Sequence, residues 1–300
     1  HRDLHSFPTR RSSDLAPDNI TPNDPRVVVR GNIAFGIMNP THTLLESGTS
    51  LLMGQIFEKV ENWGVPLQDF PDGSYAMFRN GEDYGEIVTD PVGSRAIWYY
   101  KDEELFIAST SQRAIIMFLG SFEFDERIIP WMLSTGTSGP SFTWDKRIKR
   151  IPPDSSIILN KSDWSVTTKS NLIDLEPVKR SDEQHEIQLR ETLRAFFKSI
   201  NLDWSRWVLP LSGGYDSRGI LCLLLNTGTN NQTLRTITWG LKSSKNVEGN
   251  DAFVAGNLAN KLKVSNIYYT NDISEEPIEI IIDRFILVGE GLIDNLSDYL

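Results

Sequence analysis

The part of the chain after about residue 175 alternates short apolar runs with longer helical patterns. We expect strands at 206–211, 234–239 and 266–270, and helices at 181–200, 217–226 and 251–262. Such alternation indicates a parallel sheet, because parallel neighbours need a long crossover that is usually a helix. Ligands of these sheets bind at the carboxyl ends of the strands.

Helix boundaries in this half follow from capping residues and apolar periodicity. Ser181 is expected to cap the first helix, Asn250 the last, and Gly228 to follow the end of the middle one. The apolar stripe expected on helix 181–200 comprises Leu189, Leu193, Phe196, Phe197 and Ile200.

The sequence before residue 175 has a different, strand-rich pattern. Short runs rich in aromatic and β-branched residues are separated by Gly, Asn and Asp, which is typical of antiparallel strands. The expected strands are 26–29, 33–38, 74–79, 86–90, 96–100 and 105–109, and two short helices follow at 111–120 and 125–133. A closing hairpin is expected from 148–160 and 163–170. The change of pattern predicts two domains.

One loop at the carboxyl end of an expected strand is the main candidate for a site. In "LPLSGGYDSRG", residues 209 to 219, two glycines let the backbone approach an anion closely. The helix that follows presents free N–H groups, and the hydroxyls of Ser212 and Ser217 are further donors. An acidic residue repels phosphate unless it holds a cation, so Asp216 fits a Mg²⁺ ligand beside a phosphate.

A purely structural interpretation of the same residues is equally open from the chemistry alone. "SGGYDS" could be a polar turn between a strand and a helix in which Asp216 or Ser217 is the N-cap. The stretch 248–251 before the last helix lies where an adenylating enzyme could contact its substrate, but a helix cap by Asn250 or Asp251 explains its polar residues more simply.

Four motifs in the expected order resemble asparagine synthetase and its relatives. "LSGGYDSRG" resembles the S-G-G-x-D-S loop of the ATP pyrophosphatases, or PP-loop enzymes. Residues 72–116 are similar to the family's G-x-F-A strand, its R-D-x-x-G-x-x-P-L-Y-Y segment and its F-A-S-E-x-K-A-L segment. "IKRIPPDSSIIL", residues 148–159, resembles the family's I-x-R-L-P-P-G hairpin.

The resemblance implies a fold and a domain order. Residues 16–175 would form a glutamine amidotransferase-like domain of the Ntn-hydrolase type, an α+β domain of antiparallel sheets with helices. Residues 176–300 would form an incomplete ATP-pyrophosphatase domain of the α/β PP-loop type, with a parallel sheet and helices on both faces. We expect residues 1–15 to be an adapter-derived artefact, and the family's S-G-E-G-x-D-E motif to lie beyond Leu300. "VGEGLIDN", residues 288–295, has the wrong spacing for that motif.

The resemblance also implies a reaction and its residues. A carboxylate substrate, aspartate in the commonest case, attacks the α-phosphate of ATP, pyrophosphate leaves, and ammonia or an amine displaces AMP to give an amide. With ATP and Mg²⁺ as cofactors, Asp216 would be the metal ligand and catalytic residue. The residues implied to bind ATP or pyrophosphate are Leu211, Ser212, Gly213, Gly214, Asp216, Ser217, Thr238 and Trp239.

One departure from the family leaves the source of the amine open. Glutamine hydrolysis in the family uses an N-terminal Cys as nucleophile, whereas the one Cys here is Cys222 in "ILCLLL", which we expect to be a small buried core residue. Either the artefact expected at residues 1–15 has replaced the native N-terminus, or the chain resembles relatives that do not hydrolyse glutamine. Such relatives, β-lactam synthetase and lasso-peptide cyclases, form the amide within one substrate. A non-catalytic nucleotide-binding homologue is the alternative from another class.

Composition excludes several other functions. With a net charge of -10 and a pI of about 5.0, we expect no nucleic-acid partner, because phosphate backbones are bound by basic faces. No apolar run reaches the ~20 residues of a membrane span, so we expect no membrane partner. A single Cys favours a reducing cytoplasm as the location. The resemblance is also compatible with a homodimer.

Overall fold

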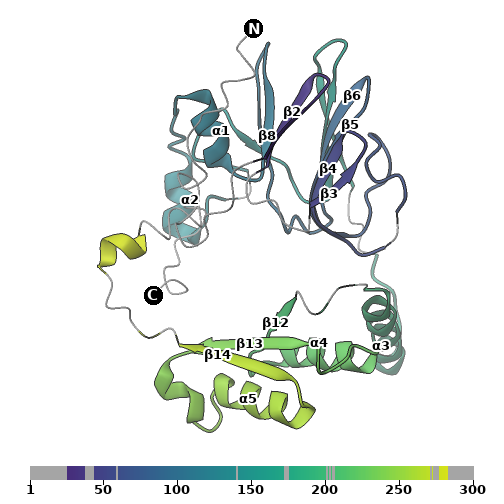
Figure 1. Cartoon of the computed structure of the whole chain (residues 1–300), viewed down its shortest axis with the longest axis vertical. Coiled ribbons are helices and arrows are strands. Elements are labelled where there is room, and N and C mark those ends of the chain that lie inside the picture. Colours follow the sequence, from purple (N-terminus) through teal and green to yellow (C-terminus); the bar gives the residue numbers. More distant parts are fainter. Residues whose placement is uncertain are drawn as a thin grey trace. The chain divides into compact units, whose positions relative to one another are not determined.

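The computed structural model describes residues 26–37, 44–58, 60–139, 141–171, 176–200, 202, 204, 207–270, 272 and 277–282. The chain divides into two compact units, with a boundary between Asp174 and Leu175. The first unit contains strands β1 to β11 and the second contains β12 to β14 (Figure 1). The helical residues 278–282 group with the first unit.

The larger sheet of the first unit has the strand order β11-β10-β6-β5-β4-β3, and all neighbours are antiparallel. Its strands are β3 (Leu44–Ser47), β4 (Ser50–Ile56), β5 (Gly73–Asn80), β6 (Tyr84–Thr89), β10 (Ser155–Asn160) and β11 (Val166–Ser170). On β5, Tyr75 and Met77 pack with Leu52, whereas Ala76 packs with Ile87 in another cluster. Because successive side chains of a strand face opposite sides, both faces of this sheet are covered.

The remaining elements of the first unit form smaller groups. β1 (Arg26–Arg30) and β2 (Ile33–Ile37) form a hairpin. β7 (Trp98–Lys101) pairs with β8 (Phe106–Ser109) and with β9 (Lys149–Arg150). The helices α1 (Gln112–Leu119) and α2 (Ile128–Thr135) each end at a left-handed glycine, Gly120 and Gly136.

The expected strands, helices and hairpin of this half are present, but two strands were not predicted. β3 and β4 lie in "LLESGTSLLMGQI", residues 44–56. This stretch is rich in Leu and Met rather than in the β-branched and aromatic residues that mark strands. Pairing of β4 with β5 along six residues therefore decides its conformation, and such long-range pairing is invisible in local sequence.

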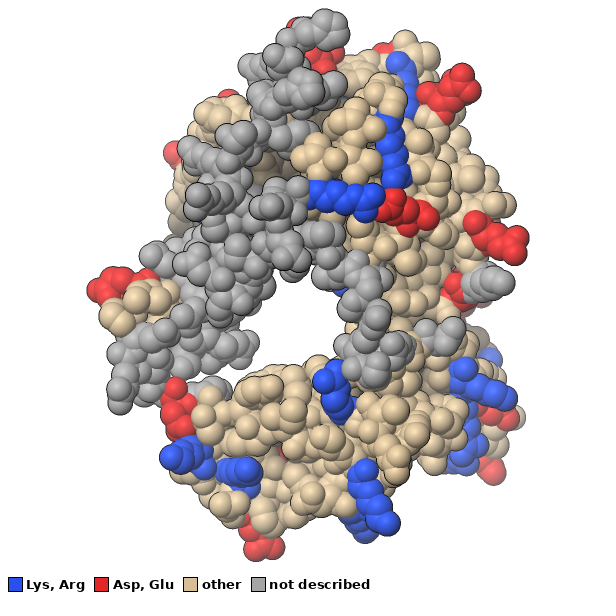
Figure 2. Space-filling view, in the orientation of Figure 1, with Lys and Arg blue, Asp and Glu red and all other residues tan. Residues whose placement is uncertain are grey.

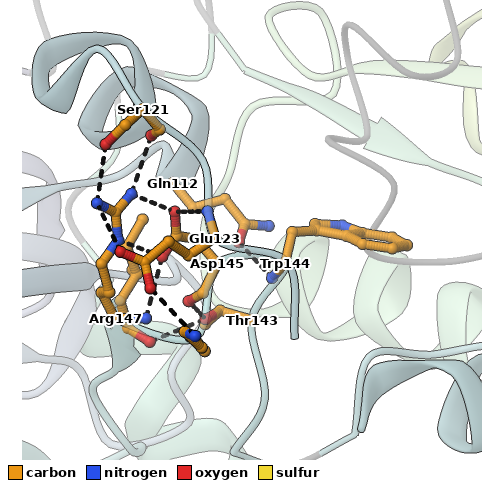
Figure 3. A network of polar contacts seen from close by, with 9 residues as sticks. Gln112, Ser121, Glu123, Thr143, Trp144, Asp145 and Arg147 are labelled. Carbon is orange, nitrogen blue, oxygen red and sulfur yellow. Dashed lines mark hydrogen bonds and ion pairs between the residues drawn. The ribbon is translucent and has the colours of Figure 1, made fainter. Parts of the chain in front are cut away.

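A polar network fixes the segment between α1 and β9 (Figure 3). The buried carboxylate of Asp145 accepts hydrogen bonds from the Arg147 guanidinium at 2.6 and 2.9 Å and from the backbone N–H of Glu123 at 3.0 Å. Arg147 also donates to the hydroxyl and the carbonyl of Ser121, each at 2.9 Å. The network thereby holds together two segments more than 20 residues apart.

The second unit contains a parallel sheet with the order β12-β13-β14. Its elements are α3 (Asp182–Ser199), β12 (Val208–Pro210), α4 (Tyr215–Asn226), β13 (Arg235–Gly240), the 3-10 helix η3 (Lys242–Asn246), α5 (Asp251–Leu262) and β14 (Ser265–Thr270). Leu221 and Leu224 of α4 share one core cluster with Ala255 and Ala259 of α5. Together the two units make a mixed α and β protein with antiparallel sheets and one three-stranded parallel sheet.

The described helices cover only one face of the parallel sheet. Thr236 and Thr238 of β13 are buried, whereas Trp239, Ile267 and Tyr269 are all exposed. Trp239 and Tyr269 are partners across the β13–β14 register, so they share a face. Helices on both faces were expected, and within the described residues the second face has none.

Two details of the helices differ from expectation. Ser181 caps α3 through a full capping box, as predicted, but no residue of α3 is buried and Leu189 is 60% exposed. Only Phe197, near its end, packs against the core of the unit. The prediction of a buried Cys222 is wrong: its side chain is exposed, because α4 turns Leu221 and Leu224 inward instead.

Some expectations fall outside the described residues, namely the artefact at 1–15 and the motif-like stretch at 288–295. For the part of the chain that the structure describes, every helix is too short or too polar to cross a membrane.

Candidate functional site

The glycine-rich loop joins the end of β12 to the start of α4, as the sequence predicts. Leu211, the first residue after β12, is 1% exposed, and its backbone N–H donates to the Ile237 carbonyl at 2.7 Å. The loop therefore begins from a backbone position fixed by the neighbouring strand β13. From there it runs out at the carboxyl end of the sheet, where ligands of parallel sheets bind.

Ser212 and Ser217 close the loop on itself. Their hydroxyl oxygens are 2.9 Å apart, and the backbone N–H of Ser212 donates to Ser217 Oγ at 3.0 Å. The Ser217 hydroxyl donates in turn to the Ser212 carbonyl at 3.1 Å, and Ser212 Oγ accepts from the Gly214 N–H at 3.2 Å. The two serines predicted to donate to an anion thus hold the loop in its shape.

Helix α4 begins at Tyr215, and its N-cap is Gly214, which provides no side-chain cap. The alternative in which Asp216 or Ser217 caps the helix is therefore wrong, since both lie inside its first turn. N–H groups of a first turn have no partner within the helix and carry the positive end of its dipole. At α4 these groups are left to an external acceptor, with Asp216 exposed among them.

Gly213 lies against the first residue of α5. A Cβ at this position would be 2.6 Å from the Asp251 Cα and 2.5 Å from its Oδ1, distances that real atoms do not reach. Only glycine fits here, and the fit brings the start of α5 next to the start of α4. Asn250 caps α5 through Ala252 N–H at 2.9 Å, as predicted, so Asp251 itself is not the N-cap.

The residues predicted to border the adenosine differ in accessibility. The side chain of Thr238 is buried, and its hydroxyl donates to the Leu211 carbonyl at 2.7 Å, so it supports the loop from within the sheet. Leu211 is likewise buried and could meet a ligand only through its backbone. Trp239 is 53% exposed and has a free aromatic face.

The sequence predictions missed one residue beside the loop and one contact of the loop. Arg218 donates from Nε to the Gly214 carbonyl at 3.0 Å, and its guanidinium lies 4.7 Å from the centre of the Tyr215 ring. It places a positive charge beside the loop, and its position directly after Ser217 was the available signal. Asp251 was noted within a stretch that could contact a substrate or cap the helix, but its contact with Gly213 was not predicted, because it joins residues 38 positions apart and leaves no local pattern.

The side chains of the loop suit a Mg²⁺ ion that a phosphate also binds, rather than a metal ion enclosed by protein ligands alone. Among the described residues, no three His, Cys, Asp or Glu side chains gather as a metal site. Mg²⁺ commonly takes one or two carboxylates and completes its shell with phosphate and water oxygens. The exposed carboxylate of Asp216, beside uncapped N–H groups, fits that arrangement.

Charges of both signs are interspersed over the described residues of the face drawn in Figure 2. The net charge of -10 disfavours anions at long range, so selection of an anion would depend on short-range donors such as those of the loop.

Comparison with known proteins gives no assignment. No family model and no curated protein matches the chain.

Proposed function

We propose that the chain belongs to an ATP-dependent ligase of the asparagine synthase type, which adenylates a carboxylate and then converts it to an amide. In this proposal the first unit is an Ntn-hydrolase-like domain and the second a PP-loop domain. The observation that carries the proposal is the loop of 212–217, where a glycine N-cap leaves the first turn of α4 open beside Asp216. The four motifs that resemble the family add to it.

The loop's own residues have defined tasks in the proposed reaction. The N–H groups of the first turn of α4, together with Arg218, stabilise the negative charge that develops on pyrophosphate as it leaves. Asp216 would hold Mg²⁺, which neutralises the phosphates when bound. Gly213 and Gly214 let the phosphate chain approach the backbone. The Thr238 hydroxyl donates to the Leu211 carbonyl and so ties the start of the loop to β13.

Aspartate is the first acid to test, and ammonia the first amine. The only Cys of the sequence, Cys222, lies on α4 and is remote in sequence from the first unit, so we propose no glutamine hydrolysis by it. A second candidate is a β-lactam-synthetase-like or lasso-cyclase-like enzyme that forms the amide within one substrate.

The products that the protein forms from ATP test the proposal. The protein with its native flanking sequence, incubated with ATP, Mg²⁺, aspartate and ammonia, should release pyrophosphate and AMP. ADP and phosphate would contradict the assignment. Exchange of labelled pyrophosphate into ATP should depend on the acid, so a panel of carboxylates identifies the substrate class.

Asp216→Asn should abolish exchange while the protein remains folded. The matched control is Asp182→Asn, which removes an exposed acid from the first turn of α3, away from the loop. Equal activity of both variants would exclude Asp216 from the site. Tight binding of Mg²⁺–ATP without exchange for any acid would instead favour the non-catalytic nucleotide-binding homologue.

A further inference from the structure

Tyr215, the first residue of α4, is exposed at the edge of the loop of 212–217. Its side chain is 87% exposed, and it is not part of the core cluster that Leu221 and Leu224 of the same helix join. Among the described residues its hydroxyl forms no hydrogen bond, and its ring contacts one charged group, the guanidinium of Arg218, at 4.7 Å. The ring therefore contributes to the placement of Arg218 rather than to the core.

Arg218 is held at two points and keeps its outer nitrogens free. Its Nε donates to the Gly214 carbonyl at 3.0 Å, and its guanidinium lies over the Tyr215 ring. Within the described part of the chain, Nη1 and Nη2 form no hydrogen bond or ion pair, and solvent reaches both. Since all three nitrogens are joined to one carbon, the free ones also lie beside Gly214, the N-cap of α4. Arg218 thus presents open donors next to the loop.

Two arginines of the first unit show how an Asp-x-Arg sequence pairs elsewhere in this chain. Arg127 donates from Nε and Nη2 to Asp125, two residues before it, at 2.8 and 2.7 Å. Arg147 donates from the same two nitrogens to Asp145, at 2.9 and 2.6 Å. In both cases a carboxylate of the fold occupies the guanidinium fork.

Asp216 and Arg218 have the same spacing, but both lie within α4. Residues two positions apart on a helix do not face each other, so this pair does not close as the other two do. Neither side chain has an ion-pair partner among the residues that the structure describes. The helix thereby keeps the Asp216 carboxylate open to a cation and the Arg218 guanidinium open to an anion.

We propose, on the basis of the proposed function, that Tyr215 is a positioning residue for the binding of pyrophosphate. Its ring holds the Arg218 guanidinium beside the loop, so that the free Nη donors meet the phosphate oxygens, while Tyr215 itself touches no phosphate. Without the ring, the long arginine side chain would lose one of its two attachments and regain rotamer freedom. The face of the aromatic ring supplies this contact, so the hydroxyl of Tyr215 is dispensable.

Binding of inorganic pyrophosphate with Mg²⁺ tests the role, measured by calorimetry at constant ionic strength on the protein with its native flanking sequence. Tyr215→Leu, which keeps an apolar side chain but removes the ring, should weaken binding about 2- to 5-fold, the range expected for an exposed cation–π contact. Tyr215→Phe, which keeps the ring, should bind as wild type does. Arg218→Gln should also weaken binding, and adding Tyr215→Leu to it should change nothing further, because Tyr215 acts only through Arg218.

The outcomes separate this inference from the proposed function. If wild type binds pyrophosphate and Tyr215→Leu binds it equally well, Tyr215 has no positioning role. The role is also excluded if Tyr215→Phe loses as much affinity as Tyr215→Leu, or if the loss in Tyr215→Leu persists in the Arg218→Gln background. These results leave the proposed function intact, whereas absence of pyrophosphate binding by wild type would overturn the proposed function and this inference with it.

Discussion

Replacing Gly213 with alanine would insert a methyl group into the contact between the loop and α5. The added Cβ would lie 2.6 Å from the Asp251 Cα and 2.5 Å from its Oδ1. Nonbonded carbons pack at about 3.5–4.0 Å, so the backbone must open by about 1 Å. The Asp251 carboxylate can rotate away, but its Cα moves only with the start of α5.

The cost can be estimated against a matched neighbour. Overpacking costs about 1–3 kcal/mol of unfolding free energy, and lower entropy of the unfolded chain returns about 0.4–1 kcal/mol for any Gly→Ala change. Gly214→Ala receives the same entropic gain, and its Cβ would meet only Ser212 Oγ, at 3.2 Å. Replacing Gly214 as the N-cap costs about 0.5–1 kcal/mol, because alanine is a much poorer N-cap than glycine. Gly213→Ala should therefore be the less stable of the two by about 0.5–2 kcal/mol.

Urea denaturation of both variants, followed by hydrogen exchange of the α4 and α5 amides, measures this difference in the second unit. Gly213→Ala should also weaken Mg²⁺–ATP binding, because the displaced backbone carries the expected phosphate donors. Equal stability of the two variants would refute the packing argument. It would mean that the loop and α5 separate without cost.

Two further predictions concern buried polar groups. Thr238→Val should cost about 1–3 kcal/mol in urea denaturation, since it leaves the buried Leu211 carbonyl without its 2.7 Å partner. Arg147→Ala should lower the free energy of unfolding by about 1.5–3 kcal/mol, because it removes charged hydrogen bonds from the buried Asp145. The matched control Lys146→Ala breaks an exposed pair with Glu123 and should cost under about 1 kcal/mol. Burial raises the pKa of Asp145, but hydrogen bonds from Arg147 and two backbone N–H groups outweigh it and leave the pKa below its usual range. This stabilisation is complete above about pH 4 and is lost as the pH falls through the lowered pKa, so the acid sensitivity of wild type should exceed that of Arg147→Ala.

The sequence was most informative where structure is decided locally. Capping residues and apolar period placed α3 and α5, with Ser181 and Asn250 as N-caps. Prediction failed where the conformation or burial of a residue depends on a partner that is distant in sequence. β4 is a strand because it pairs with β5, and Cys222 is exposed because the neighbouring leucines, rather than the whole apolar run, face the core.

The candidate site was likewise predicted where its residues are local in sequence and missed where they are distant. Ser212 and Ser217 were found from the motif, since their separation of five residues is set by one loop. Asp251 was not, because it meets Gly213 only after β13 and α5 have formed. Thr238 and Trp239 were both expected to border a ligand, but side chains alternate along β13, so Thr238 lies on the buried face of the sheet and Trp239 on the exposed face.

An uncapped helix start is not by itself a site for an anion. The side chains of Ser111, Ser181 and Asn250 cap α1, α3 and α5 by accepting a backbone N–H, whereas α2 and α4 have no side-chain cap. Of these two, only α4 has an acidic residue, Asp216, in its first turn. α4 begins with Gly214 and has no such acceptor, although Ser212 and Ser217 are close enough to bond each other. Because glycine at an N-cap costs only a few tenths of a kcal/mol relative to serine, the fold tolerates an open helix start at little expense. Uncapped N–H groups favour binding only when an acceptor outside the helix meets them. The exposed carboxylate of Asp216 repels a bare phosphate, so a phosphate bound together with a cation is the better candidate.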